Sequence, residues 1–119
     1  MPKRGDLEFL NDIQEAIKRV ENYTKNVSYT SFAQDTKTQD AVVRNIEIMG
    51  EAVKNLSDNL KKKSEQIPWK KLAGIRERVI HSYFGVNYDI IWASAKKDLK
   101  EVSSEINILL QKLKNSNNK

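Results

Sequence analysis

The sequence predicts an all-α protein folded as an antiparallel four-helix bundle. Its 119 residues include only two prolines and four glycines, and 39% of them are hydrophobic and 31% charged. This composition favours compact helical structure. Apolar residues recur at three- and four-residue steps along four segments joined by short connections, as in amphipathic helices packed side by side. Because no internal repeat divides the chain, residues 1–119 are expected to form a single domain.

The first helix is expected over about residues 7–23, where one face is apolar, with Asp6 as its N-cap. The connection that follows, residues 26–37, is polar and turn-like but contains two aromatic residues. It is expected to carry at most one short helical turn, held to the core by its aromatic side chains. This turn is the one addition to the four-helix plan.

The second helix is expected to begin at a capping box formed by Thr36 and Gln39 and to continue to about Lys62. Three consecutive lysines, residues 61–63, stand at its predicted end. Positive charge at a helix C-terminus is favoured by the helix dipole. The run is therefore interpreted as a solvated helix end rather than as a nucleic-acid contact.

Pro68 fits the first turn of a third helix, and Gly85 is expected to end that helix. Asn87 or Asp89 then caps a fourth helix. This last helix is predicted from a regular apolar series: Ile91, Ala95, Leu99, Val102, Ile106, Leu109 and Leu113. The tail, residues 114–119, is polar and without periodicity, so it is expected to fray.

Several classes of function are disfavoured by composition. The chain has no cysteine and one histidine, which excludes disulfides, thiolate metal sites and a histidine-rich zinc site. No metal and no cofactor are expected. The N-terminus lacks the apolar core of a signal peptide, and no apolar run approaches the roughly 18 residues of a membrane span, so a cytoplasmic protein without membrane contact is expected. The net charge of +5 alone does not identify a partner.

The third predicted helix carries an arginine on its apolar stripe. Arg76 lies near the centre of the apolar side, where a guanidinium is costly to bury without a partner. Glu47 and Glu51 on the second helix are candidate partners, and Arg44 on that helix can join them in an ion-pair network. Such a network would make Arg76 part of the scaffold. A bound anion, or a cleft shared with a second subunit, is the alternative.

The only histidine, His81, lies on the same helix as Arg76 and Tyr83. On an ideal helix His81 is about 140° from Arg76, whereas Tyr83 returns to within roughly 20° of it. One straight helix does not aim all three side chains at a point. Either they converge near the last turn before Gly85, or a second copy of the protein completes the site.

The arrangement of Arg76, His81 and Tyr83, R-x4-H-x-Y, resembles the R-x4-6-H signature of HEPN domains in the form found in HepT-like toxins. The likeness extends to three segments in the family's order, and so over nearly the whole chain: DAVVRNIEIMGEAVKNLS (40–57), IPW (67–69) and GIRERVIHSYFGVNYDIIW (74–92). One position departs from the family. The residue after the motif arginine is commonly asparagine in HEPN nucleases, and here it is Glu77, whose charge is expected to weaken RNA cleavage.

The resemblance implies an HEPN-like bundle that acts as a homodimeric, metal-independent endoribonuclease. It also implies that the protein is the toxin of a toxin–antitoxin pair, whose partner is a minimal nucleotidyltransferase that adenylylates Tyr83. The residues suit this chemistry independently. His81 can move the proton of a ribose 2′-hydroxyl, and Arg76 can stabilise the charge that develops on the phosphate. Tyr83 can position either the phosphate or the histidine.

Because cleavage also needs an acid for the leaving 5′-oxygen and the chain has no second histidine, a dimer with two motifs in one groove is favoured. AMP on Tyr83 would block such a groove by bulk and negative charge. Two other interpretations remain. In one, the protein is a non-catalytic subunit that presents nucleotides or other substrates to a nucleotidyltransferase. In the other, it is a helical dimerisation module without a ligand.

Overall fold

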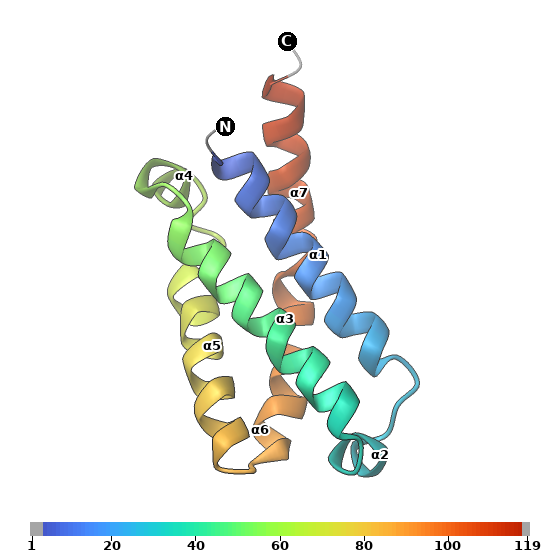
Figure 1. The fold of residues 1–119 in the computed structure, drawn as a ribbon. Helices are drawn as coiled ribbons and strands as arrows, with labels where there is room; N and C mark the ends of the chain where they lie inside the picture. The colour runs from blue at the N-terminus through green and yellow to red at the C-terminus, as the bar shows by residue number, and fades with distance from the viewer. Residues whose placement is uncertain (1–3, 118–119) are drawn as a thin grey trace.

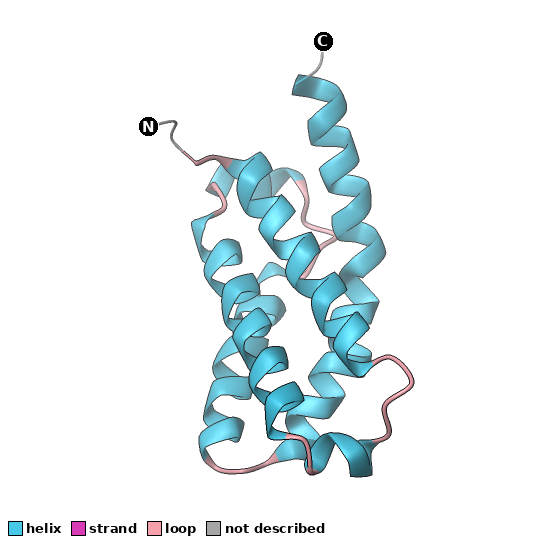
Figure 2. Cartoon of the chain, turned by 45° about the vertical axis from the view of Figure 1, so that its right-hand side comes forward, coloured by secondary structure: helices cyan, strands magenta, loops and turns pink. Residues whose placement is uncertain are grey.

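The computed structural model describes residues 4–117, and it confirms the all-α class: the described residues form helices and connecting loops, with no strand (Figure 2). The helices, in chain order, are α1 (Asp6–Thr24), α2 (Tyr29–Ala33), α3 (Thr36–Asn55), α4 (Asp58–Lys63), α5 (Trp69–Phe84), α6 (Tyr88–Ala93) and α7 (Leu99–Asn117). A π-helical segment, η1 (Ser94–Asp98), joins α6 to α7, so residues 88–117 form one continuous helical rod. The short turn expected in the first connection is α2.

The long helices form a bundle in which successive helices run in opposite directions (Figure 1). Helix α3 packs between α1 and α5, and α7 packs against α1. Helix α1 begins and α7 ends at the same end of the bundle, where the last turns of α7 extend beyond the other helices. The core consists of fully buried apolar side chains from every long helix: Leu10, Ile13, Val20, Ile46, Met49, Leu72, Ile75, Val79, Ile106 and Leu110.

The predicted start of the first helix is wrong by one residue. Gly5, not Asp6, occupies the N-cap, and its backbone N–H donates to Oε2 of Glu8 at 3.3 Å. Asp6 lies in the first turn, and its carboxylate accepts from the backbone N and the Oγ of Ser57 at 2.8 and 2.6 Å. A contact 51 residues away in the sequence therefore replaces the local cap.

The capping box predicted for Thr36 and Gln39 is also wrong. Asp35 is the N-cap of α3, and its carboxylate accepts from the backbone N and the Oγ of Thr38 at 3.1 and 2.6 Å. These bonds, the side-chain bond first, hold the pKa of the Asp35 carboxyl below its ordinary value. Gln39 is buried instead, and its Nε2 donates to the carbonyl of Phe32 at 2.8 Å, which ties α2 to α3.

The second predicted helix does not continue to Lys62. Helix α3 ends at Asn55, because Leu56 adopts an extended backbone and Ser57 caps a new helix by accepting from the N–H of Leu60 at 3.1 Å. The break turns α4 away from the axis of α3 (Figure 1). The three lysines still occupy a helix end, the last turn of α4.

The other predicted boundaries lie close to the observed ones. Pro68 is the N-cap of α5 and Gly85 its C-cap, while Asn87 is the N-cap of α6 without a side-chain bond. The left-handed residue of this turn is Val86, at φ 59°, rather than Gly85. The apolar series of the last helix is buried through residue 106 and then continues at Leu110. Helix α7 reaches Asn117, so the tail predicted to fray is helical over 114–117, and residues 118–119 lie outside the described part.

Candidate active site

Arg76 lies in the middle of α5 on the side that faces α3, and its aliphatic chain crosses Gly50 of that helix. A Cβ atom added at Gly50 would lie 2.2 Å from Cδ and 2.5 Å from Cβ of Arg76. Real contacts of this kind are essentially never shorter than 3.0 Å. The absence of a side chain at Gly50 is therefore what allows the two helices to hold the arginine between them.

The polar end of Arg76 remains accessible. The side chain is 30% exposed, and Nη1 donates to Oε1 of Glu77 at 2.8 Å. Its Nε is buried and has no hydrogen-bond partner among residues 4–117. Glu77, the next residue along the helix, is thus the acidic partner of Arg76, and the structure gives no ion pair between Arg76 and Glu47 or Glu51 in the part it describes.

Two hollows meet at Arg76. One, of about 400 Å³, lies between α1 and α3 and is lined by Arg44, Glu47, Glu51 and Arg76 among others. The other, of about 520 Å³, lies between α3, α4 and α5. The Arg76 side chain therefore borders both hollows.

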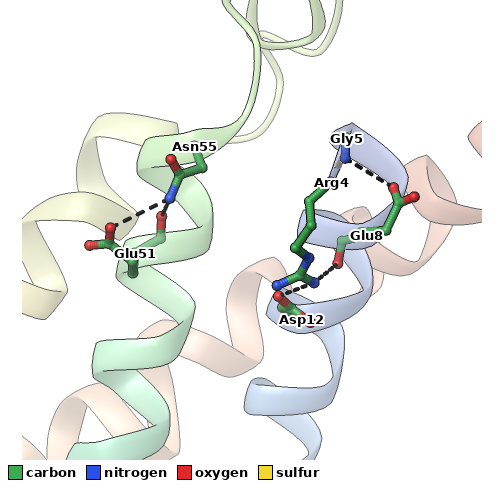
Figure 3. Close-up of polar contacts among 6 residues, drawn as sticks. All are labelled: Arg4, Gly5, Glu8, Asp12, Glu51 and Asn55. Atoms are coloured by element: carbon green, nitrogen blue, oxygen red, sulfur yellow. Dashed lines mark hydrogen bonds and ion pairs between the residues drawn. The ribbon is translucent and has the colours of Figure 1, made fainter. Parts of the chain in front are cut away.

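Some of the polar and charged side chains around the hollow between α1 and α3 already form ion pairs or hydrogen bonds with neighbouring residues (Figure 3). On the α1 side, Arg4 pairs with Asp12 at 2.6 Å. On the α3 side, Asn55 donates to the backbone carbonyl of Glu51 at 2.8 Å and to its Oε1 at 3.5 Å. Arg44 and Glu47 make no ion pair with any described residue. The ion-pair network considered as one alternative for Arg76 is therefore not formed among the described residues. Arg44, Glu47 and Glu51 line one hollow together with Arg76 instead.

His81 lies on the last turn of α5, and its side chain is exposed. The ring makes no hydrogen bond to the residues that the structure describes, so it is free to meet a ligand. Beyond it, Phe84 is 82% and Val86 63% exposed, the two highest values among the large apolar side chains described. A left-handed backbone is unusual for a β-branched residue such as Val86. The imidazole therefore lies next to exposed apolar residues and has no side-chain partner among residues 4–117.

Tyr83 points in a different direction from His81. Its side chain is half-buried, and its hydroxyl donates to Oδ1 of Asp40 in the first part of α3. Asp40 was not identified from the sequence, since 43 residues separate it from Tyr83 and no local pattern links them. The sequence pointed to Asp40 only through its position at the start of segment 40–57, one of the three segments that resemble the family.

One protomer does not gather the three motif residues at a point. Arg76 contacts Gly50, whereas Tyr83 contacts Asp40, ten residues away along α3. With a rise of about 1.5 Å per residue, Arg76 and Tyr83 are attached roughly 10 Å apart along α5. The structure brings together Arg76 and Glu77, and it leaves the imidazole of His81 on the surface.

Two features are absent among residues 4–117. No group of three or more histidine, cysteine, aspartate or glutamate side chains is placed to hold a metal ion in this part of the chain. None of the described helices combines the length and the apolar character that crossing a membrane would require.

The family model described as "Ribonuclease HepT-like" matches residues 13–109. Among curated proteins, "Putative RNase MJ0127" of Methanocaldococcus jannaschii is 43% identical over 110 residues, which are 89% of this chain and 91% of that protein. "Probable ribonuclease HepT" of Thermococcus cleftensis is 39% identical over 103 residues, 87% of this chain and 94% of that protein. "Putative RNase TTE0752" of Caldanaerobacter subterraneus is 42% identical over 105 residues, 88% and 90% of the two chains. No solved structure gives a significant match.

Proposed function

Because the chain belongs to the HepT-like ribonuclease family, we propose that it is a metal-independent endoribonuclease and the toxin of a toxin–antitoxin pair. Its active site is formed by Arg76 and His81 at the cleft of a homodimer. The observation that carries this proposal is the accessible guanidinium of Arg76, held across Gly50, on the same helix as the exposed imidazole of His81.

In the proposed reaction, His81 accepts the proton of a ribose 2′-hydroxyl as the 2′-oxygen attacks the adjacent phosphorus. The bond between phosphorus and the 5′-oxygen breaks, leaving a 2′,3′-cyclic phosphate, and the leaving oxygen takes a proton from a second histidine in its protonated form. Arg76 donates hydrogen bonds to the phosphate oxygens, where negative charge accumulates in the transition state. A positioned histidine typically contributes a factor of about 10² to 10⁴ in rate.

The second imidazole would come from a second copy of the chain. The separation of Arg76 and Tyr83 along α5 argues against a complete site within one protomer. The exposed Phe84 and Val86 beside His81 form an apolar surface of the kind that subunit interfaces cover. Dimerisation around this surface would bring two copies of α5 and two imidazoles to one cleft.

The ion pair with Glu77 weakens phosphate binding by Arg76 without preventing it. Its carboxylate holds Arg76, but the Glu77 side chain is 75% exposed. Exposed ion pairs are worth roughly 0 to 1 kcal/mol, because water screens them and both side chains lose entropy. A phosphate that accepts two hydrogen bonds from the guanidinium can therefore displace Glu77 at small cost.

The position of Tyr83 is compatible with inhibition of the toxin by modification of this residue. We propose that a minimal nucleotidyltransferase adenylylates its hydroxyl, which bonds to Asp40 in this structure. The tyrosine oxygen attacks the α-phosphorus of ATP, the bond to the β-phosphate breaks, and pyrophosphate and the hydroxyl proton are released. An attached AMP would replace that bond with a phosphodiester, whose charge the Asp40 carboxylate repels. The nucleotide would then be directed away from α3, toward the space where the RNA must lie. Co-expression with such an enzyme should add the mass of AMP to the wild type and not to Tyr83→Phe.

The separation of Arg76 and Tyr83 along α5 also supports a second candidate function. In that version, the protein is a non-catalytic subunit that binds nucleotides or other substrates for a nucleotidyltransferase, and the residues around Arg76 form a scaffold. It predicts that purified protein leaves RNA intact while still binding the partner.

RNA cleavage in the presence of EDTA separates the two functions. The wild type should cut RNA, and His81→Ala should lose a factor of about 10² or more in rate, as expected for removal of a general base. Arg76→Ala should be similarly impaired, whereas Arg78→Ala, an exposed arginine two residues along the same helix, should cut normally. If His81→Ala cleaves at the wild-type rate, or only the metal-supplemented protein cleaves, the proposal is wrong.

A further inference from the structure

The hollow between α3, α4 and α5 has a basic rim. Three lysines from three helices line it: Lys54 in the last turn of α3, Lys61 in the last turn of α4 and Lys70 in the first turn of α5. Arg76 lines its other end. We call this surface, with Trp69 and Val53 at its floor, the lysine groove.

The charges of the lysine groove are largely unpaired. None of Lys54, Lys61 and Lys70 forms an ion pair with a residue that the structure describes. The one acidic side chain that lines the groove is Glu77, which is already bonded to Arg76. Four cationic side chains and one carboxylate thus line the groove, although Lys61 and Lys70 also line an adjoining hollow with Asp58 and Glu65. This excess of positive charge makes the groove complementary to a chain of negative charges.

The floor of the lysine groove offers nothing that reads a base. Val53 is apolar, and the indole N–H of Trp69 already donates to Oγ of Ser64 at 3.2 Å. Contacts made only through lysine charges hold a nucleic-acid backbone in place without selecting its sequence. An RNA phosphodiester backbone therefore fits the groove better than a ligand that needs specific hydrogen bonds.

We propose that the lysine groove binds the RNA backbone on one side of the cleavage point, an inference that rests on the proposed ribonuclease function. Lys70 is attached about 9 Å from Arg76 along α5, whereas His81 lies beyond Arg76 in the opposite direction. The RNA then runs from the groove across Arg76 to His81. Lys61 contacts phosphate in this arrangement, although its run of three lysines was interpreted from the sequence as a solvated helix end.

The test is the salt dependence of RNA binding in a His81→Ala background, which prevents cleavage. The probe is a fluorescein-labelled oligouridylate, followed by fluorescence anisotropy. For single strands, the slope of log K against log salt is about −0.7 per phosphate contact. Replacing Lys54, Lys61 and Lys70 together by glutamine should make the slope shallower by about 2 and weaken binding at low salt.

The matched control replaces Lys18, Lys37 and Lys112 by glutamine, which removes the same charge from exposed positions outside the groove. Its slope should stay close to that of the parent. Arginine at the three groove positions should preserve binding, and this variant separates loss of charge from a folding defect. Equal slopes for the two glutamine variants would overturn the proposal.

Two other outcomes are distinguishable. If the wild type does not cleave RNA but the groove variant alone loses oligouridylate binding, the groove stands and the ribonuclease function fails. If the groove lysines are needed to bind an acidic peptide such as polyglutamate and not oligouridylate, the surface is a protein-binding site and the RNA inference is wrong.

Discussion

Replacing Gly50 with alanine tests whether Arg76 depends on the gap at this position of α3. The added Cβ would lie 2.2 Å from Cδ, 2.5 Å from Cβ and 2.7 Å from Cγ of Arg76. The flexible end of the arginine can move, but its Cβ is fixed by the backbone of α5. To restore an ordinary carbon–carbon separation of about 3.5 Å, the two helices must separate by roughly 1 Å.

Gly74 on α5 provides the matched control, because a Cβ there meets no atom within 4 Å. Both changes replace a glycine inside a helix by alanine, which by helix propensity alone stabilises by about 1 kcal/mol. That gain cancels when the two variants are compared. The difference between them is the cost of overpacking at Gly50, about 1–3 kcal/mol.

Thermal unfolding followed by circular dichroism measures this difference. For a chain of this size, 1 kcal/mol corresponds to roughly 3–6 °C in Tm, so Gly50→Ala should unfold several degrees below Gly74→Ala. RNA cleavage by Gly50→Ala, assayed with EDTA below its transition, should fall relative to the wild type because the guanidinium is displaced; Gly74→Ala, at a position that lines the lysine groove, serves as the control for stability alone. If Gly50→Ala unfolds at or above the temperature of Gly74→Ala and cleaves normally, the contact with Arg76 does not constrain the site.

Two further predictions concern helix caps. Because hydrogen bonds from Thr38 lower the pKa of the Asp35 carboxyl in the folded state, its contribution to stability is complete above the ordinary value of 3.8 and disappears as the pH falls through the lowered pKa. The Tm difference between the wild type and Asp35→Ala should thus be largest near neutral pH and shrink in acid, and a constant difference would contradict this account. Ser57→Ala removes the cap of α4 and a partner of Asp6, so it should cost about 0.5–2 kcal/mol in denaturant unfolding, whereas Ser104→Ala, exposed on α7, should not destabilise the protein.

The helices themselves were predictable because burial of an apolar stripe imposes a 3.6-residue period that can be read directly. Apolar residues such as Ile13, Ile46 and Ile106 lie in the core as that period requires. The helix stop at Gly85 and the short turn in the first connection were also anticipated. The caps were less predictable, since several polar residues near each helix start can accept the same N–H groups, and distant contacts such as that of Asp6 with Ser57 decide among them.

Some features of the candidate site were likewise predictable from the sequence, and others were not. The sequence placed Arg76 on an apolar helix face and His81 at its border, and both positions follow from the geometry of one helix. It did not identify Glu77 as the partner of Arg76, since pairing depends on how the guanidinium bends after crossing α3. Nor did it reveal the bond between Tyr83 and Asp40.

The sequence by itself therefore determined the class of fold, most of the helices and the residues proposed here for the active site, because periodicity and side-chain chemistry are properties of a single segment. Only the tertiary structure decided that Gly50 admits Arg76 between two helices and that α4 turns aside to open the lysine groove. Both depend on the distance between α3 and its neighbours. That distance is set by the packing of the whole core, and no segment encodes it alone.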